Sequence, residues 1–224
     1  MTTHSWPRWR VTEFLKPDEV DALLLAVRLD GDRLLLRTLW ETGGRPGEVA
    51  RLLPEHIDTK NNCILLLNFK QRRHRITGSR QHPHPLKRVY LFPESTLCQD
   101  LLEYCRGQHI KPGEWVFPSR RSASKPFSAV TLWRLVTTLA EGLGIRYVKK
   151  DPRTGEYRNK PAWPHTFRHG SAVNMLERTS RIDVVRDQLG HASVSTTEIY
   201  AHLTDVSRKR IIEKSLRPEE EEST

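Results

Sequence analysis

The sequence predicts an α+β fold that is mostly helical, with a small three-stranded antiparallel sheet. Apolar residues recur at three- and four-residue spacing through most of the 224 residues, as on the buried face of α-helices. The stretch 55–92 interrupts this spacing with two short apolar runs bounded by asparagine and proline. Short runs of that kind, between turn-forming residues, are typical of strands.

Three helices are predicted before the sheet. Pro17 can open the first, which carries an apolar face from Val20 to Val27 and stops near Asp30-Gly31. A leucine-rich second helix covers 32–42 and ends at Gly43-Gly44, a C-terminal stop signal. Pro46 can then start the next helix, so Arg45 lies at a sharp corner between two helices. Taken alone, Arg45 could simply pair with Glu48 for structure.

The sheet is predicted from the runs Cys63–Leu67 and Val89–Phe92, and Ile76-Thr77 can add a strand between them. The segment between the two runs, KQRRHRITGSRQHPHPLKR, holds seven Lys or Arg residues, three His residues and no acidic residue. Such a segment cannot be core and suits a phosphate backbone. The alternative is a solvated basic loop.

The later helices follow from the same apolar spacing. One begins at Pro93-Glu94, and Ser128 can cap another over 129–142, with Val130, Trp133, Val136 and Ala140 predicted to face inward. Residues 145–160 carry six Lys or Arg residues around a turn and favour a basic hairpin. Further helices are predicted at 167–178 (capped by Thr166), at 181–189 (ending at Gly190), just after Ser195, and at 205–216.

Composition limits the class of protein. The net charge is +10 and the isoelectric point about 9.8, which favours a polyanionic partner such as nucleic acid over the alternative of a merely basic soluble protein. No apolar run approaches the roughly 18 residues of a membrane span, and the N-terminus lacks a signal-peptide pattern, so we expect a cytoplasmic protein. Three cysteines without C-x-x-C spacing indicate neither a disulfide framework nor a zinc ribbon.

The stretch 165–202 concentrates chemically capable residues where a stable core needs none of them. His165 and Arg168 lie three residues apart at the start of a predicted helix, and His191 and Tyr200 follow Leu189-Gly190. Arginine offers a bidentate fork to phosphate, histidine moves protons near neutral pH, and tyrosine can be a covalent nucleophile. His165 and His169 could instead share a metal, although no acidic residue occupies the H-E-x-x-H position.

The order of these residues resembles the signature of a known family. H-x-x-R (165–168), L-G-H (189–191) and Tyr200 follow one another, and Thr42-Gly43-Gly44-Arg45-Pro46-Gly47-Glu48-Val49 matches an upstream T-G-x-R-x-x-E-[LV] box. Together they resemble the tyrosine site-specific recombinases of the phage-integrase family. The resemblance runs from about residue 12 to about residue 215.

The resemblance implies a role for each matching residue. Tyr200 would attack a DNA phosphodiester and form a 3′-phosphotyrosine link, while Arg45 and Arg168 clamp the phosphate and His191 donates to it. His165 would be the general base. Lys70 would be the general acid for the leaving 5′-oxygen, with Lys87 as the runner-up because the loop between the strands is long. Neither metal, nucleotide nor other cofactor is expected.

The resemblance also implies an organisation and partners. We expect a flexible arm over 1–10, a catalytic domain over 11–216 and an acidic tail over 217–224. The partner would be double-stranded DNA, bound as a dimer or tetramer with a possible accessory DNA-binding protein and no membrane. The expected DNA contacts are Arg72, Arg73, Arg75, Arg80, Lys87, Arg88, Lys149 and Lys150.

The sequence leaves two questions open. A type IB topoisomerase or telomere resolvase would use similar chemistry, and a non-catalytic DNA-binding regulator could keep the fold. Most family members also carry an N-terminal helical domain that closes around DNA, whereas this sequence begins almost at the expected catalytic domain. We therefore expect either a truncated chain or a compact single-domain member.

Overall fold

The computed structural model describes residues 14–67, 86–150 and 157–190. Within these ranges the helices are α1 (Pro17–Ala26), α2 (Asp30–Thr42), α3 (Pro46–Val49), the 3₁₀ turn η1 (Pro54–His56), α4 (Leu97–Gly107), α5 (Ala129–Gly142), α6 (Pro164–Thr179) and α7 (Ile182–Leu189). The strands are β1 (Ile57–Asp58), β2 (Cys63–Leu67), β3 (Leu86–Tyr90), β4 (Pro118–Ser119), β5 (Ser122–Pro126), β6 (Arg146–Lys150) and β7 (Tyr157–Pro161). The predicted α+β class is confirmed.

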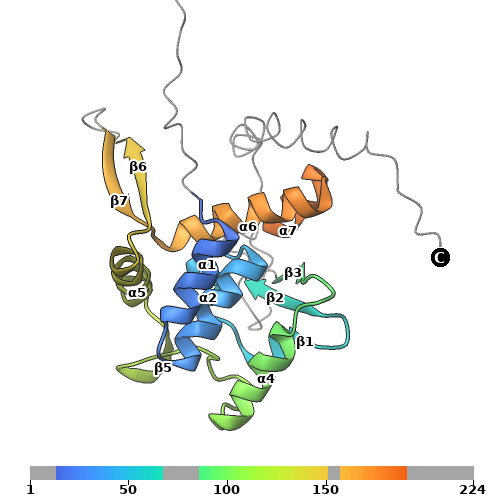
Figure 1. The fold of residues 1–224 in the computed structure, drawn as a ribbon. Coiled ribbons are helices and arrows are strands. Elements are labelled where there is room, and N and C mark those ends of the chain that lie inside the picture. Colours follow the sequence, from blue (N-terminus) through green and yellow to red (C-terminus); the bar gives the residue numbers. More distant parts are fainter. Residues whose placement is uncertain (1–13, 68–85, 151–156, 191–224) are drawn as a thin grey trace, which may run out of the picture.

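Helix α2 packs against several of the other helices. It contacts α1, α4 and α6, and α6 continues into α7 along one side of the molecule (Figure 1). Leu35, Leu36 and Leu39 on α2 are fully buried, as the leucine-rich pattern predicts. The helix ends at Gly43, whose φ of 57° is left-handed and therefore suits glycine. The chain thus leaves α2 sharply, with Arg45 directly after the corner.

The main sheet has three antiparallel strands in the order β1-β2-β3. Strand β2 pairs with β3 from Cys63↔Tyr90 to Leu67↔Leu86. The third strand is Ile57–Asp58, which pairs with the start of β2. The sequence pattern predicts a third strand at Ile76-Thr77 instead, and those residues lie outside the described ranges.

Two separate hairpins lie beyond this sheet. Strands β4 and β5 pair over the basic loop at Arg120-Arg121. Strands β6 and β7 form the predicted basic hairpin, which projects away from the helices (Figure 1).

Three sequence expectations about helices need correction. Helix α4 begins at Leu97 and not at Pro93, because residues 93–94 form a turn. Helix α6 begins at Pro164, with Trp163 as the N-cap, so Thr166 lies inside the first turn and its hydroxyl donates to the Trp163 carbonyl at 2.6 Å. Proline is well suited to the first helical position, and that preference decides where α6 starts.

The third correction concerns the buried face of α5. Ser128 caps this helix as predicted, accepting from the Thr131 amide at 3.0 Å. However, Val130 and Trp133 are 60% and 53% exposed, whereas Leu132 is buried with Val136 and Ala140. The helix is therefore rotated relative to the expected orientation.

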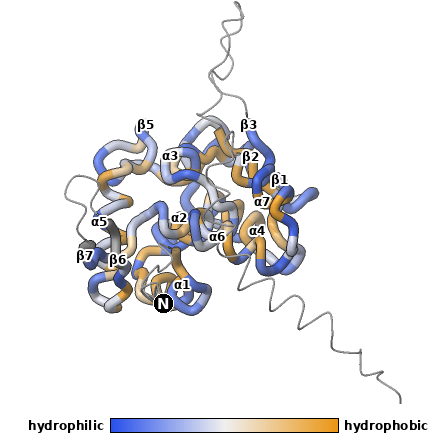
Figure 2. Tube along the Cα trace, turned by 90° about the horizontal axis from the view of Figure 1, so that it is seen from above, coloured by the Kyte–Doolittle hydropathy of each residue, from blue (hydrophilic) through white to orange (hydrophobic). Residues whose placement is uncertain are grey.

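The buried apolar residues form one large and one small cluster. The large cluster joins α1, α2, the main sheet, α4 and α5. The small cluster lies between α6 and α7, where Ala172, Met175 and Leu176 meet Val185 and Leu189. The tube in Figure 2 accordingly changes between hydrophobic and hydrophilic colours along each helix.

The three cysteines are free and buried, and burial raises the pKa of Cys98 to about 12. No helix in the described ranges has the length and apolar character needed to cross a membrane. The predicted arm at 1–10, the tail at 217–224 and the helices after Ser195 lie outside those ranges.

Candidate active site

Arg45 and Arg168 are brought to one place although they lie far apart in the sequence. The Nη1 group of Arg168 donates to the Gly43 carbonyl at 2.5 Å, two residues before Arg45. Its Nη2 group donates to the Leu189 carbonyl at 2.9 Å. The Arg168 side chain, in a residue only 6% exposed, is therefore held between the end of α2 and the end of α7.

Arg45 is oriented by Glu48. The Glu48 side chain is fully buried; its Oε1 accepts from Arg45 Nη1 at 2.5 Å and its Oε2 from the Arg45 amide at 3.0 Å. The Arg45 side chain keeps 18% of its exposure. A guanidinium carries five N–H donors, so the ion pair uses only part of its capacity. The structural pairing suggested by the sequence is present, and it orients Arg45 rather than burying it.

Lys87 completes a connected network between the two arginines. Its ammonium lies 2.8 Å from Glu48 Oε2 and donates to the Leu189 carbonyl at 3.3 Å. Contacts therefore run from Arg45 through Glu48, Lys87 and Leu189 to Arg168. Arg45 and Lys87 both contact the single Glu48 carboxylate, and Arg168 joins them through the Leu189 carbonyl, so positive charge is in excess among these four side chains.

The ionisation of these groups reflects their surroundings. Burial by itself would raise the pKa of Glu48, but the Lys87 ammonium and then Arg45 outweigh it and lower that pKa. Burial lowers the pKa of Lys87, and Arg168 and Arg45 lower it further, while Glu48 opposes the shift. Glu48 is therefore a carboxylate at neutral pH, and both arginines lie within electrostatic reach of the Lys87 ammonium.

The corner at Gly43 makes this arrangement possible. A Cβ at Gly43 would lie 2.6 Å from Leu189 Cδ2 and 2.9 Å from Ser171 Oγ. Since real Cβ atoms do not approach that closely, a larger residue would force the Leu189 and Ser171 side chains, or the helices that carry them, to shift. The small residue at this corner thus brings the first arginine close to the second.

His165 is the second residue of α6 and is exposed, three positions before the buried Arg168. Of the remaining expected site residues, Lys70, His191 and Tyr200 lie outside the described ranges. No group of three or more His, Cys, Asp or Glu residues in the described ranges is placed to hold a metal ion.

The expected DNA contacts are placed only in part. Arg88 is exposed on β3, and Lys149 and Lys150 lie on β6 of the projecting hairpin. Arg72, Arg73, Arg75 and Arg80 lie outside the described ranges. Lys87 differs from the expectation, because its side chain is buried and paired with Glu48 instead of facing outward with Arg88.

Strand alternation could have found the position of Lys87. Along β3, residues 86, 88 and 90 are exposed while Lys87 and Val89 are buried. The apolar run alone starts this strand at Val89 and so leaves Lys87 in the loop. A strand that begins earlier places Lys87 on the same face as Val89.

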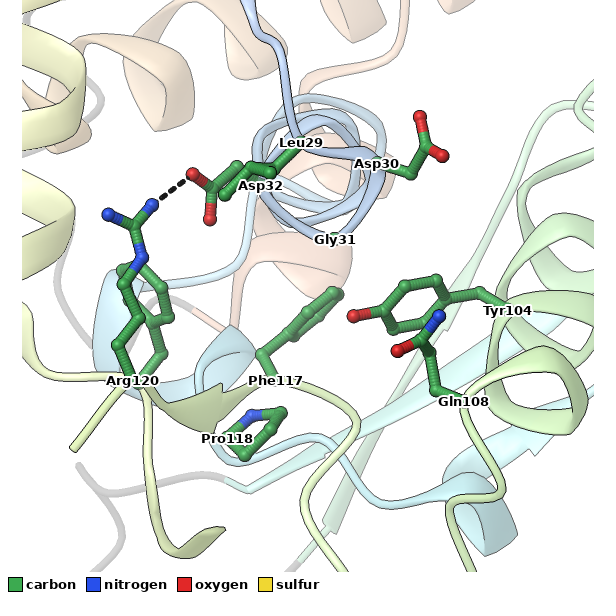
Figure 3. Close-up of a pocket in the computed structure, with 10 residues that line it drawn as sticks. Leu29, Asp30, Gly31, Asp32, Tyr104, Gln108, Phe117, Pro118 and Arg120 are labelled. Carbon is green, nitrogen blue, oxygen red and sulfur yellow. Dashed lines mark hydrogen bonds and ion pairs between the residues drawn. The ribbon is translucent and has the colours of Figure 1, made fainter. Parts of the chain in front are cut away.

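An open pocket of about 350 Å³ lies elsewhere in the molecule. Figure 3 shows Arg120 reaching Asp32 on one side of it, with Tyr104 and Gln108 on the other. None of the expected site residues lines this cavity, so we do not assign the chemistry to it.

The sequence profile of the Phage integrase family matches residues 13–206. The chain belongs to the phage integrase family. This match covers both arginine boxes, the L-G-H turn and Tyr200 of the sequence.

Named relatives of this phage integrase family member agree with that assignment. It is 27% identical over 203 residues to tyrosine recombinase XerA of Pyrococcus furiosus, covering 90% of this chain and 61% of that protein. It is 30% identical over 225 residues to an integrase/recombinase of Escherichia coli, covering 89% of this chain and 62% of that protein. The chain therefore spans about 61% of the length of these relatives.

Solved structures show the same fold. The crystal structure of XerA recombinase superposes with a TM-score of 0.67 at 24% identity, covering 95% of this chain and 68% of that one. XerH site-specific recombinase bound to difH substrate superposes with a TM-score of 0.62 at 18% identity, covering 88% of this chain and 53% of that one.

Proposed function

We propose that this chain carries the catalytic domain of a site-specific DNA recombinase that cuts and rejoins DNA through a 3′-phosphotyrosine intermediate. The observation that supports this best is the linked pair Arg45 and Arg168, held together with positive charge in excess. An arginine pair of this kind suits a phosphate that gains charge in a transition state. Family membership supplies the rest of the assignment.

In the proposed reaction the Tyr200 oxygen attacks the phosphorus and the bond to the 5′-oxygen breaks. The tyrosine proton leaves with the help of His165, and the 5′-oxygen takes a proton from Lys70. The two arginines and His191 hold the non-bridging oxygens. A 5′-hydroxyl of a partner strand then attacks the phosphotyrosine and restores the phosphodiester and the free tyrosine.

The proposed reaction needs no external energy source, because the energy of each broken phosphodiester bond is conserved in the phosphotyrosine ester. Each preorganised donor on the phosphate would lower the activation free energy of cleavage by about 3–4 kcal/mol. We propose double-stranded DNA as the substrate and a dimer or tetramer on DNA as the active form. Among structures with this fold, XerH bound to difH and a lambda integrase dimer bound to a core site are DNA complexes.

Covalent capture tests the proposal even though the target sequence is unknown. Purified protein is incubated with sheared DNA from its source, the mixture is denatured, and DNA that remains attached to protein is sequenced. We expect attached fragments to share one site, and a nicked copy of that site to trap a protein–DNA band that is lost in Tyr200→Phe.

Other outcomes would point elsewhere. DNA binding without any covalent band would favour a regulator, and a band that persists in Tyr200→Phe would mean another nucleophile. Relaxation of supercoiled DNA without strand transfer between two sites would favour a type IB topoisomerase.

A further inference from the structure

Lys87 is a buried charged residue to which the scheme above gives no role. Its side chain is 8% exposed, on the inner face of β3 and opposite Leu66 of β2. Lysine is rarely buried to this degree unless it is paired. The pairing here involves two groups that each bear directly on a phosphate-binding arginine.

The first group is the Glu48 carboxylate. It accepts from Arg45 Nη1 and, at 2.8 Å, meets the Lys87 ammonium. A fully buried carboxylate with Arg45 as its principal cation would draw the guanidinium toward itself. Lys87 also pairs with Glu48, so Glu48 can orient Arg45 while the cluster of three residues keeps a net positive charge.

The second group is the Leu189 carbonyl, which also accepts from Arg168 Nη2. Strand β3 holds this end of α7 at a further point, because the Gln188 side chain accepts from the Tyr90 amide at 3.0 Å and donates to the Tyr90 carbonyl at 3.1 Å. The carbonyl that orients Arg168 is therefore fixed to the strand that carries Lys87.

We propose that Lys87 is a positioning residue that sets Arg45 and Arg168 at the spacing of a single phosphate, through Glu48 and the Leu189 carbonyl. This inference rests on the proposed function. An ammonium has three N–H donors, and two already point at Glu48 and Leu189. That geometry is suited to holding the pocket together and poorly suited to delivering a proton to a leaving oxygen.

The test compares Lys87→Met and Lys87→Arg with the wild type in single-turnover cleavage of the captured site. Lys60→Met is the matched control, since Lys60 is an exposed lysine in the turn before β2. Each protein is given ordinary DNA and DNA with a sulfur at the bridging 5′ position. A thiolate leaves without needing a proton, so the sulfur substrate bypasses the general acid.

We expect Lys87→Met to cleave both substrates about 10- to 100-fold more slowly, as for other residues that orient a binding group. Lys87→Arg should recover part of the rate, and DNA affinity should stay near the wild-type value. Recovery of Lys87→Met on the sulfur substrate would overturn the inference, because Lys87 would then be the general acid. An unchanged rate, or a loss explained by weaker DNA binding alone, would overturn it as well.

Thermal unfolding tests the same link independently of cleavage. Lys87→Met leaves the Glu48 charge buried with less compensation, so adding Glu48→Gln should raise the unfolding temperature of the Lys87→Met protein. A double variant no more stable than Lys87→Met would contradict the proposed link. Wild-type protein that cleaves neither substrate would count against the proposed function, while the unfolding comparison would still decide on Lys87 and Glu48.

Discussion

The guanidinium of Arg168 combines two tasks that a smaller cation could not share. It donates to the Gly43 and Leu189 carbonyls and lies beside the proposed phosphate position. A planar fork can satisfy two acceptors in fixed directions, whereas an ammonium is a compact point charge on a flexible stem. Charge alone is therefore insufficient at this position.

Arg168→Lys should accordingly lose about 10²- to 10³-fold in cleavage rate, although the charge is kept. It should also lose about 1–3 kcal/mol of stability, because a buried carbonyl is left without a donor. Single-turnover cleavage and urea unfolding measure the two effects. Arg178→Lys on the same helix is the control, since Arg178 pairs with Glu94 at the surface; an equal loss there would contradict the argument.

Glu48 predicts how stability depends on acid. Its pKa in the folded protein is lowered from the ordinary value of 4.5, so its contribution is fully present above that value and is lost as pH falls through the folded pKa. Urea unfolding between neutral pH and about pH 3 should show this loss. The Glu48→Gln protein should be less stable at neutral pH, and its free energy of unfolding should fall less as the pH is lowered. An equal fall in the variant and the wild type would contradict the prediction.

At the scale of elements, the junction of α2 with α6 and α7 depends on one backbone position. Gly43 has a φ of 57° and lies too close to Leu189 and Ser171 for a Cβ atom. The positive φ and the short distances from a Cβ to Leu189 and Ser171 would both destabilise the fold if another residue replaced Gly43. They also mean that a change here moves the carbonyl that holds Arg168.

Gly43→Ala should therefore cost about 1–3 kcal/mol in urea unfolding. It should also reduce cleavage, because Arg168 loses its acceptor geometry. Gly142→Ala is the matched control: nothing lies within 4 Å of a Cβ there and the residue is helical. That variant should be neutral or up to about 1 kcal/mol more stable; similar losses in both variants would rule out the contact as the cause.

The sequence predicts most elements, because apolar spacing and proline or glycine punctuation act locally. It could not fix the rotation of α5, since Val136 and Ala140 belong both to the expected apolar row with Trp133 and to the observed row with Leu132. Only packing against other elements chooses between two such rows. The predicted start of α6 is wrong because it relies on Thr166 as the cap; Pro164 indicates the observed start, since proline is favoured at the first helical position.

In the candidate site, too, local patterns predict some residues and only the fold reveals others. Family motifs indicate Arg45 and Arg168, and the fold places them together. Lys87 contacts Glu48, 39 positions before it, and Leu189, 102 positions after it. Local patterns carry no information on such pairings, apart from the two-residue alternation along β3.

At the scale of the whole molecule, the net charge of +10 predicts salt-sensitive DNA binding. We expect affinity to fall about 10³-fold or more between about 50 and 200 mM salt, as when roughly six phosphates are neutralised. Fluorescence anisotropy measures this slope. Arg88→Gln should reduce the slope of log affinity against log salt concentration by about 1, and Arg106→Gln on α4 should leave that slope unchanged. A wild-type affinity that does not change with salt would contradict an interface with DNA phosphates.

The Leu189 carbonyl, which Lys87 and Arg168 share, lies late in the sequence, so these two side chains can be linked only late in synthesis. Leu189 is the last residue of α7 and bonds to Arg168 at a separation of 21 residues and to Lys87 at 102. A growing chain that ends before Leu189 already contains both arginines and Lys87, yet it lacks the acceptor that aligns them. An interrupted translation product that ends before Leu189 would thus carry both arginines and Lys87 without the carbonyl that links Lys87 to Arg168.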